Sequence, residues 1–266
     1  MPYNFHDDRK KYFQMQTEVT EHFIIPFIEQ ARALPEGGRV LEIGCGEAGV
    51  LKAFIKRGWR AVGVDLAPEK LALARQLMHD EIKDGRLELI NENIYEERFK
   101  QKFKKQFDLI ILKDVIEHIP DQPRLLSYLH TFLREQGVIF FAFPPWYMPF
   151  GGHQQMCASF LKKMPYFHLL PMPLYRLVLK MAGESSNKIE ALAANKRTGI
   201  TIERFERILK KSGYAILTKR FYLFNPIYRY KFGLTPKEQY ALIARLPYIR
   251  DFLTTGVYYL VTRSKD

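Results

Sequence analysis

The chain has 266 residues, of which 47% are hydrophobic and 26% are charged. These values are ordinary for a globular domain with a sizeable core, and they exclude a largely disordered or fibrous protein. The two cysteines, Cys45 and Cys157, form no CxxC pair and are too few for a disulfide framework. The polar start of the sequence lacks the apolar core of a signal peptide, so we expect a reduced, cytoplasmic protein.

The net charge of +12 is unevenly distributed. Residues 1–145 have 21 Lys and Arg against 22 Asp and Glu, whereas residues 146–266 have 20 against 7, a net of +13. Such an excess can indicate an anionic substrate, a nucleic acid, a membrane surface or only a solvated basic face. The most apolar late stretch, residues 166–182, is interrupted by prolines and basic residues, so we expect no transmembrane segment.

Taken in chain order, the hydrophobic pattern predicts a first helix and then alternating strands and helices. The predicted strands are residues 39–43, 60–65, 87–90, 107–112, 137–143, 214–224 and 256–263, and the predicted helices are 10–34, 49–57, 68–79, 123–134 and 201–212. This alternation is typical of an α/β fold with a doubly wound, mostly parallel sheet covered by helices on both faces. Ligands of such sheets bind at the carboxyl ends of the strands.

The regular alternation stops at Pro144, resumes near residue 199 and is interrupted again before the last strand. We therefore predict a single domain with one core, an N-terminal helical cap and two insertions that form a lid. These parts comprise residues 36–145, 199–224 and 255–264 for the core, 1–35 for the cap, and 146–198 and 225–253 for the insertions. Within the second insertion, Thr235 to Glu238 has the pattern of a capping box and predicts the start of a helix.

A glycine-rich turn follows the first predicted strand. Gly44, Gly46 and Gly49 have G-x-G-x-x-G spacing, which lets the backbone turn sharply and lets a ligand approach closely. Glu42 lies just before this turn, where a carboxylate would repel a phosphate and attract an ammonium group. The alternative is that Glu42 points away into solvent.

Asp65 ends the second predicted strand, where a carboxylate can accept hydrogen bonds from both hydroxyls of a ribose. Leu66 follows it and can pack on an adenine ring. The alternative for Asp65 is a helix N-cap. Together with Glu42, Asp65 predicts a nucleoside ligand that carries a positive charge.

The fourth strand and its continuation carry the most specific motif. Residues 107–120, FDLIILKDVIEHIP, resemble the segment F-D-x-I-x-x-x-x-V-x-E-H-I of class I methyltransferases that use S-adenosylmethionine (SAM). The chain resembles this family also in its LEIGCG and GVD motifs, and over residues 38–143, 199–224 and 256–263 in all. The resemblance implies a Rossmann-like, seven-stranded sheet whose last strand is antiparallel.

The resemblance also implies roles for particular residues. Glu42, Gly44 and Gly46 would line the methionine side of SAM, Asp65 would hold the ribose, and Leu66 would lie beside the adenine. Three further positions match cofactor contacts of the family: Asn93 and Ile94 at the adenine, and Lys113 with its backbone at the methionine. Asn93 departs from the acidic residue that is common there, although its amide oxygen can also accept a hydrogen bond. Glu117 and His118 are read as architectural, and no metal site is predicted.

The expected chemistry is displacement at the SAM methyl carbon, for which the protein supplies alignment. A hydroxyl nucleophile would also need a general base. His153 is the candidate base, because it follows the fifth strand in a glycine-rich loop and histidine is the side-chain type best suited to proton transfer near neutral pH. The alternative is a loop histidine that is bonded to backbone.

The acceptor is expected to be a small or lipid-like, anionic molecule bound under the lid, and peripheral membrane contact would be compatible with it. An RNA methyltransferase is the main alternative, since the second half is basic, but no RNA-binding module is recognisable. A non-catalytic SAM-binding protein is a further alternative. A nicotinamide oxidoreductase is disfavoured by Glu42.

Overall fold

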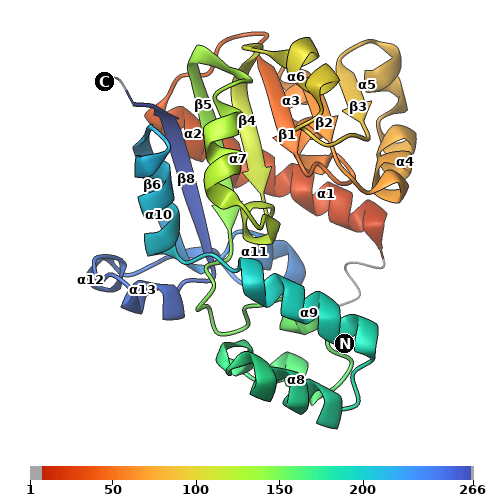
Figure 1. The fold of residues 1–266 in the computed structure, drawn as a ribbon. Helices are drawn as coiled ribbons and strands as arrows, with labels where there is room; N and C mark the ends of the chain where they lie inside the picture. The colour runs from red at the N-terminus through yellow and green to blue at the C-terminus, as the bar shows by residue number, and fades with distance from the viewer. Residues whose placement is uncertain (1–7, 265–266) are drawn as a thin grey trace.

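The computed structural model describes residues 8–264, and its centre is one eight-stranded sheet with the strand order β3-β2-β1-β4-β5-β8-β6-β7 (Figure 1). The strands are β1 (Arg39–Ile43), β2 (Arg60–Val64), β3 (Leu87–Ile90), β4 (Phe107–Lys113), β5 (Leu133–Phe143), β6 (Tyr214–Phe224), β7 (Lys237–Glu238) and β8 (Gly256–Arg263). Strands β1 to β5 pair in parallel, and β8 runs antiparallel between β5 and β6. The predicted fold class, with its antiparallel last strand, is confirmed.

The sheet has one strand more than predicted. The short strand β7 pairs with β6 through Tyr222 and Phe224, at the edge of the sheet. The helix predicted to start at Thr235 is wrong, because the segment that carries the capping-box pattern pairs with this edge instead. Main-chain pairing with an open strand edge outweighs a local capping preference here. The next helix, α12, begins only at Ala241.

Helices cover both faces of the sheet, as the alternating pattern predicted. One face carries α1 (Arg9–Val19), a π-helical turn (Thr20–Ile24), α2 (Ile25–Ala31), α3 (Gly49–Lys56), α4 (Pro68–Leu77) and α5 (His79–Lys83). The other face carries α6 (Glu97–Phe103), α7 (Gln122–Leu129) and α10 (Ile202–Lys211). Successive strand residues alternate between the two cores: Leu109 and Ile111 face the first, and Ile110 and Leu112 face the second.

The third glycine of the G-x-G-x-x-G pattern serves helix packing. A Cβ atom on Gly49 would lie 2.5 Å from the carbonyl oxygen of Phe13 on α1. The hydroxyl of Thr17 donates a hydrogen bond of 2.9 Å to the carbonyl oxygen of Gly49. Helix α1 therefore lies directly on the start of α3, which brings the N-terminal helix close to the glycine turn.

The two insertions lie beyond the carboxyl ends of the parallel strands. The first contains short 3₁₀ turns, α8 (Met172–Met181) and α9 (Ser186–Thr198), which share a small core of their own. Figure 1 shows α8 and α9 on the side toward which the arrow of β4 points. The second contains α11 (Ile227–Phe232), β7, α12 (Ala241–Ala244) and α13 (Ile249–Phe252). Their closure over a ligand stays a prediction.

The insertions contact each other at Phe252. The hydroxyl of Tyr166 donates a hydrogen bond of 2.9 Å to the Phe252 carbonyl oxygen, and the rings of Tyr147 and Phe252 stack with centroids 5.0 Å apart. The two segments thus support one another at the carboxyl edge of the sheet. Between residues 8 and 264, no helix has the length and apolar character needed to cross a bilayer.

Candidate active site

The glycine turn after β1 combines one crowded and one open position. Gly44 has a φ of +72°, and a Cβ atom on it would lie 2.5 Å from Cγ2 of Val115. Gly46 has a φ of +50°, but among the described residues an added Cβ would have only Cδ of Lys70 within 4 Å, at 3.8 Å. Gly44 therefore lets the chain pass close to the segment after β4, whereas Gly46 faces space that a ligand can occupy.

Glu42 is buried at the end of β1, with 3% of its surface exposed, so it does not point into solvent. Its Oε2 atom has no hydrogen-bond partner among the described residues. Burial raises the pKa of Glu42 well above its usual value; the nearby Lys113 opposes this rise, and Asp65 adds to it. A buried carboxylate without a donor is costly, so this position fits a ligand that brings a positive, hydrogen-bonding group.

The cation nearest to Glu42 is already paired. Lys113, at the end of β4, forms an ion pair with the neighbouring Asp114. Burial by itself lowers the pKa of Lys113, but the charge of Asp114, helped by Tyr12 and Glu42, outweighs this and raises it. Because Lys113 is paired with Asp114, it does not supply the hydrogen-bond donor that Oε2 of Glu42 lacks among the described residues.

Asp65 is fixed beside the glycine turn by two backbone donors. Its Oδ2 accepts a hydrogen bond of 2.8 Å from the amide of Gly46, and its Oδ1 accepts one of 2.8 Å from the amide of Ala67. Ala67, and not Asp65, is the N-cap residue of α4. Each carboxylate oxygen keeps a second lone pair, so Asp65 can still accept from ribose hydroxyls. Leu66 is 69% exposed and presents an apolar side chain beside it.

The two residues after β3 that were predicted to contact the adenine differ in exposure: Asn93 is at the surface and Ile94 is buried. Asn93 is exposed, but its Oδ1 already accepts a hydrogen bond of 3.1 Å from the amide of Tyr95. Ile94 is 6% exposed and packs in the core between the sheet and α6. A ligand contact of Ile94 would therefore involve its backbone more readily than its side chain.

Sequence reasoning missed Asn91, whose side-chain amide donates a hydrogen bond of 2.9 Å to the carbonyl oxygen of Asp65. This bond joins the ends of β2 and β3 and holds the backbone that carries Asp65 and Leu66. Its position directly after a strand, next in order to Asp65, is the signal that could have identified it.

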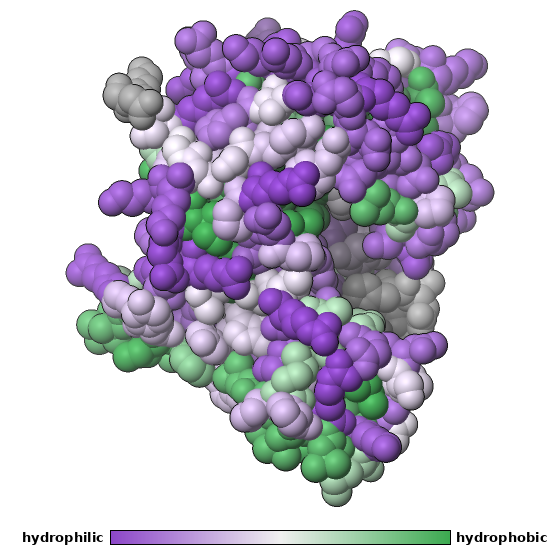
Figure 2. Space-filling view, viewed as in Figure 1, coloured by the Kyte–Doolittle hydropathy of each residue, from purple (hydrophilic) through white to green (hydrophobic). Residues whose placement is uncertain are grey.

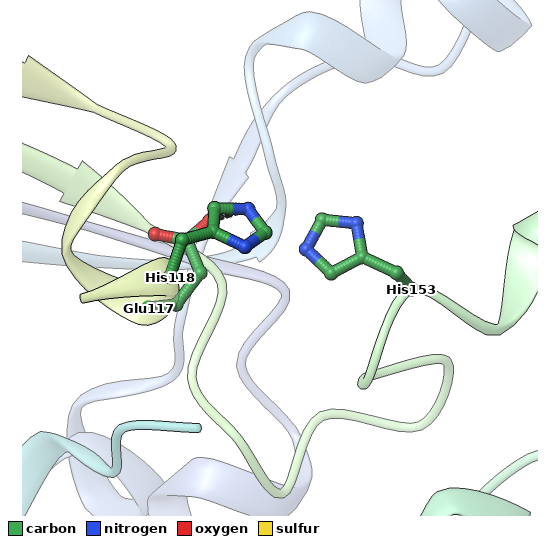
Figure 3. Close-up of side chains that lie close together, drawn as sticks. All are labelled: Glu117, His118 and His153. Carbon is green, nitrogen blue, oxygen red and sulfur yellow. Dashed lines mark ion pairs between the residues drawn. The ribbon is translucent and has the colours of Figure 1, made fainter. Parts of the chain in front are cut away.

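The structure also places His153 beside Glu117 and His118, a pair that the sequence did not connect with it. Glu117 and His118 lie in a 3₁₀ turn after β4, and His153 lies in the first insertion. The rings of His118 and His153 have centroids 4.6 Å apart, and Figure 3 shows His153 pointing one ring nitrogen at His118. One possible ligand atom from each of the three residues lies within 4.8 Å of the others.

The site thus gathers most of the predicted residues at one edge of the sheet. Glu42, the glycine turn, Asp65 and Lys113 end or follow β1, β2 and β4, which are neighbours in the sheet. His153 lies near the segment that follows β4, where its ring contacts that of His118. The roles assigned to these residues stay predictions, although their meeting at the strand ends is observed.

Comparison with known proteins identifies the family. A family model described as a methyltransferase domain matches residues 15–219. A ubiquinone biosynthesis O-methyltransferase from Histophilus somni (strain 2336) is 31% identical over 118 residues, which are 43% of this chain and 48% of that protein. The chain spans about half the length of the curated relatives it matches.

Solved structures share the fold at low identity. Phosphoethanolamine N-methyltransferase 2 from Haemonchus contortus superposes with a TM-score of 0.54 at 18% identity, covering 91% of this chain and 52% of that one. Geranyl diphosphate C-methyltransferase from Streptomyces coelicolor A3(2) gives a TM-score of 0.56 at 14% identity, covering 90% and 78%. Since the family model covers most of its length, the chain belongs to the methyltransferase domain family, as its resemblance to class I SAM-dependent methyltransferases predicted.

Proposed function

We propose that the protein transfers the methyl group of SAM to a small or lipid-like acceptor. The observation that carries this proposal is the buried carboxylate of Glu42, whose Oε2 atom has no hydrogen-bond partner among the described residues and which lies beside the open glycine turn. The α-ammonium group of the methionine part of SAM would supply the missing donor and the missing positive charge. A pyrophosphate would meet repulsion at the same place.

The other residues fit the remaining parts of SAM. Asp65, held by the amides of Gly46 and Ala67, would accept hydrogen bonds from the ribose hydroxyls. The exposed side chain of Leu66 would pack on the adenine. SAM supplies an activated methyl group on a sulfonium, so the task of the protein is to align the acceptor with it and to exclude water.

A hydroxyl-bearing, lipid-like acceptor is supported by two observations. The curated relatives are named for O-methylation in ubiquinone biosynthesis. In addition, large apolar side chains are exposed on both insertions, and Figure 2 shows them as green areas over α8 and over α12 and α13. Those on α8 are Leu174, Leu177 and Met181, and those near α12 and α13 are Leu242, Tyr248 and Ile249. With a net charge of +13 over residues 146–266, these surfaces suit an amphipathic molecule with an anionic group.

This acceptor class can be tested by transfer of a labelled methyl group. We would offer the protein radiolabelled SAM with three acceptors in parallel: phenolic lipids with anionic groups, matching short-chain phenols, and RNA of mixed sequence. We expect the label in the phenolic lipid, at a kcat/KM higher than for the short-chain phenol, because apolar surface is buried on binding. Label found only in RNA, with steep salt dependence, would contradict the proposal.

The insertions can be tested in the same assay. The double variant Leu177→Asp/Met181→Asp places charges on the apolar face of α8 and should lower kcat/KM for the lipid by about tenfold, with the short-chain phenol unaffected. Leu217→Asp is the matched control, because Leu217 is 40% exposed but lies on β6, outside both insertions. If the control and the α8 variant lose the same fraction of kcat/KM for the lipid, the apolar surface of the first insertion does not bind the acceptor.

A further inference from the structure

We propose that Glu117, His118 and His153 bind a divalent metal ion beside the methionine side of the cofactor site. Glu117 and His118 come from the turn after β4, and His153 comes from the loop after β5. One possible ligand atom of each lies within 4.8 Å of the other two, and small side-chain rotations would bring all three to the distances of a metal site. Figure 3 shows the two imidazoles facing one another, with the carboxylate behind the first.

The buried carboxylate is the first argument that this cluster holds a ligand. The side chain of Glu117 is only 7% exposed, and neither of its oxygens has a hydrogen-bond partner among the described residues. Its nearest cationic candidate is Nε2 of His118, at 3.9 Å, which is beyond hydrogen-bond reach. An ionised carboxylate in this position needs a compensating charge, and a divalent cation would supply it.

The second argument is the orientation of His118. Its Nδ1 lies 3.2 Å from Oδ1 of Asn195 on α9. An amide oxygen can only accept, so Nδ1 carries the proton and Nε2 is left with its lone pair on the side of Glu117. Histidines that bind metals commonly donate their second ring nitrogen to an oxygen in this way.

The third argument is the backbone of the two segments. His153 has a φ of +56°, a conformation that is uncommon for residues other than glycine and that directs its ring toward His118. Asp114 also has a positive φ, of +56°, just before the turn that carries Glu117 and His118. The positive φ angles at Asp114 and His153 are local deviations from regular structure. They occur in the two segments whose side chains, Glu117, His118 and His153, converge.

The identity of the donors indicates the kind of ion. One carboxylate and two imidazoles suit Zn²⁺, Mn²⁺, Co²⁺ or Fe²⁺ better than Ca²⁺, which prefers oxygen ligands throughout. Three protein ligands leave at least one coordination position open, as in catalytic and not in purely structural sites. Glu117 is buried, His153 is partly buried and His118 is exposed, so solvent reaches the cluster on the side of His118.

This site would act on the acceptor, an inference that rests on the proposed function. Val115 contacts the glycine turn at Gly44, so the turn that carries Glu117 and His118 lies next to the methionine side of SAM. A hydroxyl of the acceptor that binds the open position would lose its proton to solvent more readily, because the ion stabilises the oxyanion. The oxygen then forms a bond to the methyl carbon while the carbon–sulfur bond breaks, and the electron pair stays on sulfur. His153 would then be a metal ligand and not the general base.

The test measures metal binding separately from SAM binding. Protein freed of metal with a chelator would be titrated with Mn²⁺, followed by electron paramagnetic resonance, and with Zn²⁺, followed by calorimetry. We expect one ion per chain. Glu117→Gln and His153→Gln should each weaken binding at least about tenfold, because each removes one of three ligands. Asn195→Ala should weaken it less, by a few-fold, since Asn195 only orients His118.

His79→Gln is the matched control, because His79 is an exposed histidine on α5, far along the chain from the cluster. It should bind the ion as the unaltered protein does. SAM titrations of the same samples show whether each variant is folded. Absence of stoichiometric binding, or equal affinity in Glu117→Gln, His153→Gln and the control, would overturn the metal site even where SAM binds. Metal binding without SAM binding would instead contradict the proposed function and leave the metal site in place.

Discussion

Gly46→Val is expected to abolish SAM binding while the protein stays folded. Between residues 8 and 264, a Cβ atom added at Gly46 would approach only the flexible side chain of Lys70, so a valine there would enter the space that the cofactor is proposed to occupy. The positive φ of +50° costs a valine about 1–2 kcal/mol of stability. We expect the affinity for SAM to fall at least about 100-fold, equivalent to about 2.7 kcal/mol, in a calorimetric titration.

Two other glycines serve as comparisons for this variant. Gly58 has a φ of +81°, and no atom of the described residues lies within 4 Å of a Cβ added there. Gly58→Val therefore has the same kind of strain away from the site and should bind SAM normally. Gly44→Val should lose SAM binding and also be less stable by about 1–3 kcal/mol, because its Cβ would overlap Val115. Normal SAM binding by Gly46→Val would show that the cofactor does not lie on this turn.

Asp65→Ala is expected to weaken SAM binding by about 1.5–3 kcal/mol, which is roughly 10- to 150-fold. The substitution removes the charged acceptors proposed for the ribose hydroxyls, and it also releases the amides of Gly46 and Ala67. Calorimetric titration with SAM and with S-adenosylhomocysteine would measure the loss. Both compounds should be affected equally, because they share the ribose.

Asp121→Ala is the control for the structural part of this effect. Asp121 also accepts a hydrogen bond from a backbone amide, that of Arg124, where it caps α7. Its removal should lower the melting temperature without changing SAM affinity. If Asp65→Ala behaves like Asp121→Ala, then Asp65 supports the fold and does not hold the ribose.

The hydrophobic pattern was sufficient to predict the parallel part of the sheet, because each strand is a short apolar run bounded by turn residues. The predicted strands 39–43 and 87–90 coincide with β1 and β3, and 107–112 ends one residue before β4 does. Strand β5 begins earlier than predicted, at Leu133, because Leu133 pairs with Phe107 although polar residues interrupt the apolar run after it. Strand β7 was missed for a similar reason, because it depends on a partner that local sequence does not reveal.

The candidate site was predictable where a residue's role follows from its place at a strand end. Glu42 and Asp65 directly follow apolar runs, and parallel strands bring their ends to one edge. The cluster of Glu117, His118 and His153 was not predictable in this way. It depends on the path of an insertion and on a positive φ at His153, and neither leaves a periodic signal in the sequence.

The most direct test of the central claim is a calorimetric titration of the unaltered protein with SAM and, separately, with NAD. Glu42 is buried and its Oε2 atom has no hydrogen-bond partner among the described residues, so it should favour a ligand with an ammonium group and disfavour a pyrophosphate. We predict binding of SAM with a dissociation constant of about 1–100 μM, one molecule per chain, and no measurable binding of NAD. Binding of NAD without binding of SAM would contradict the account.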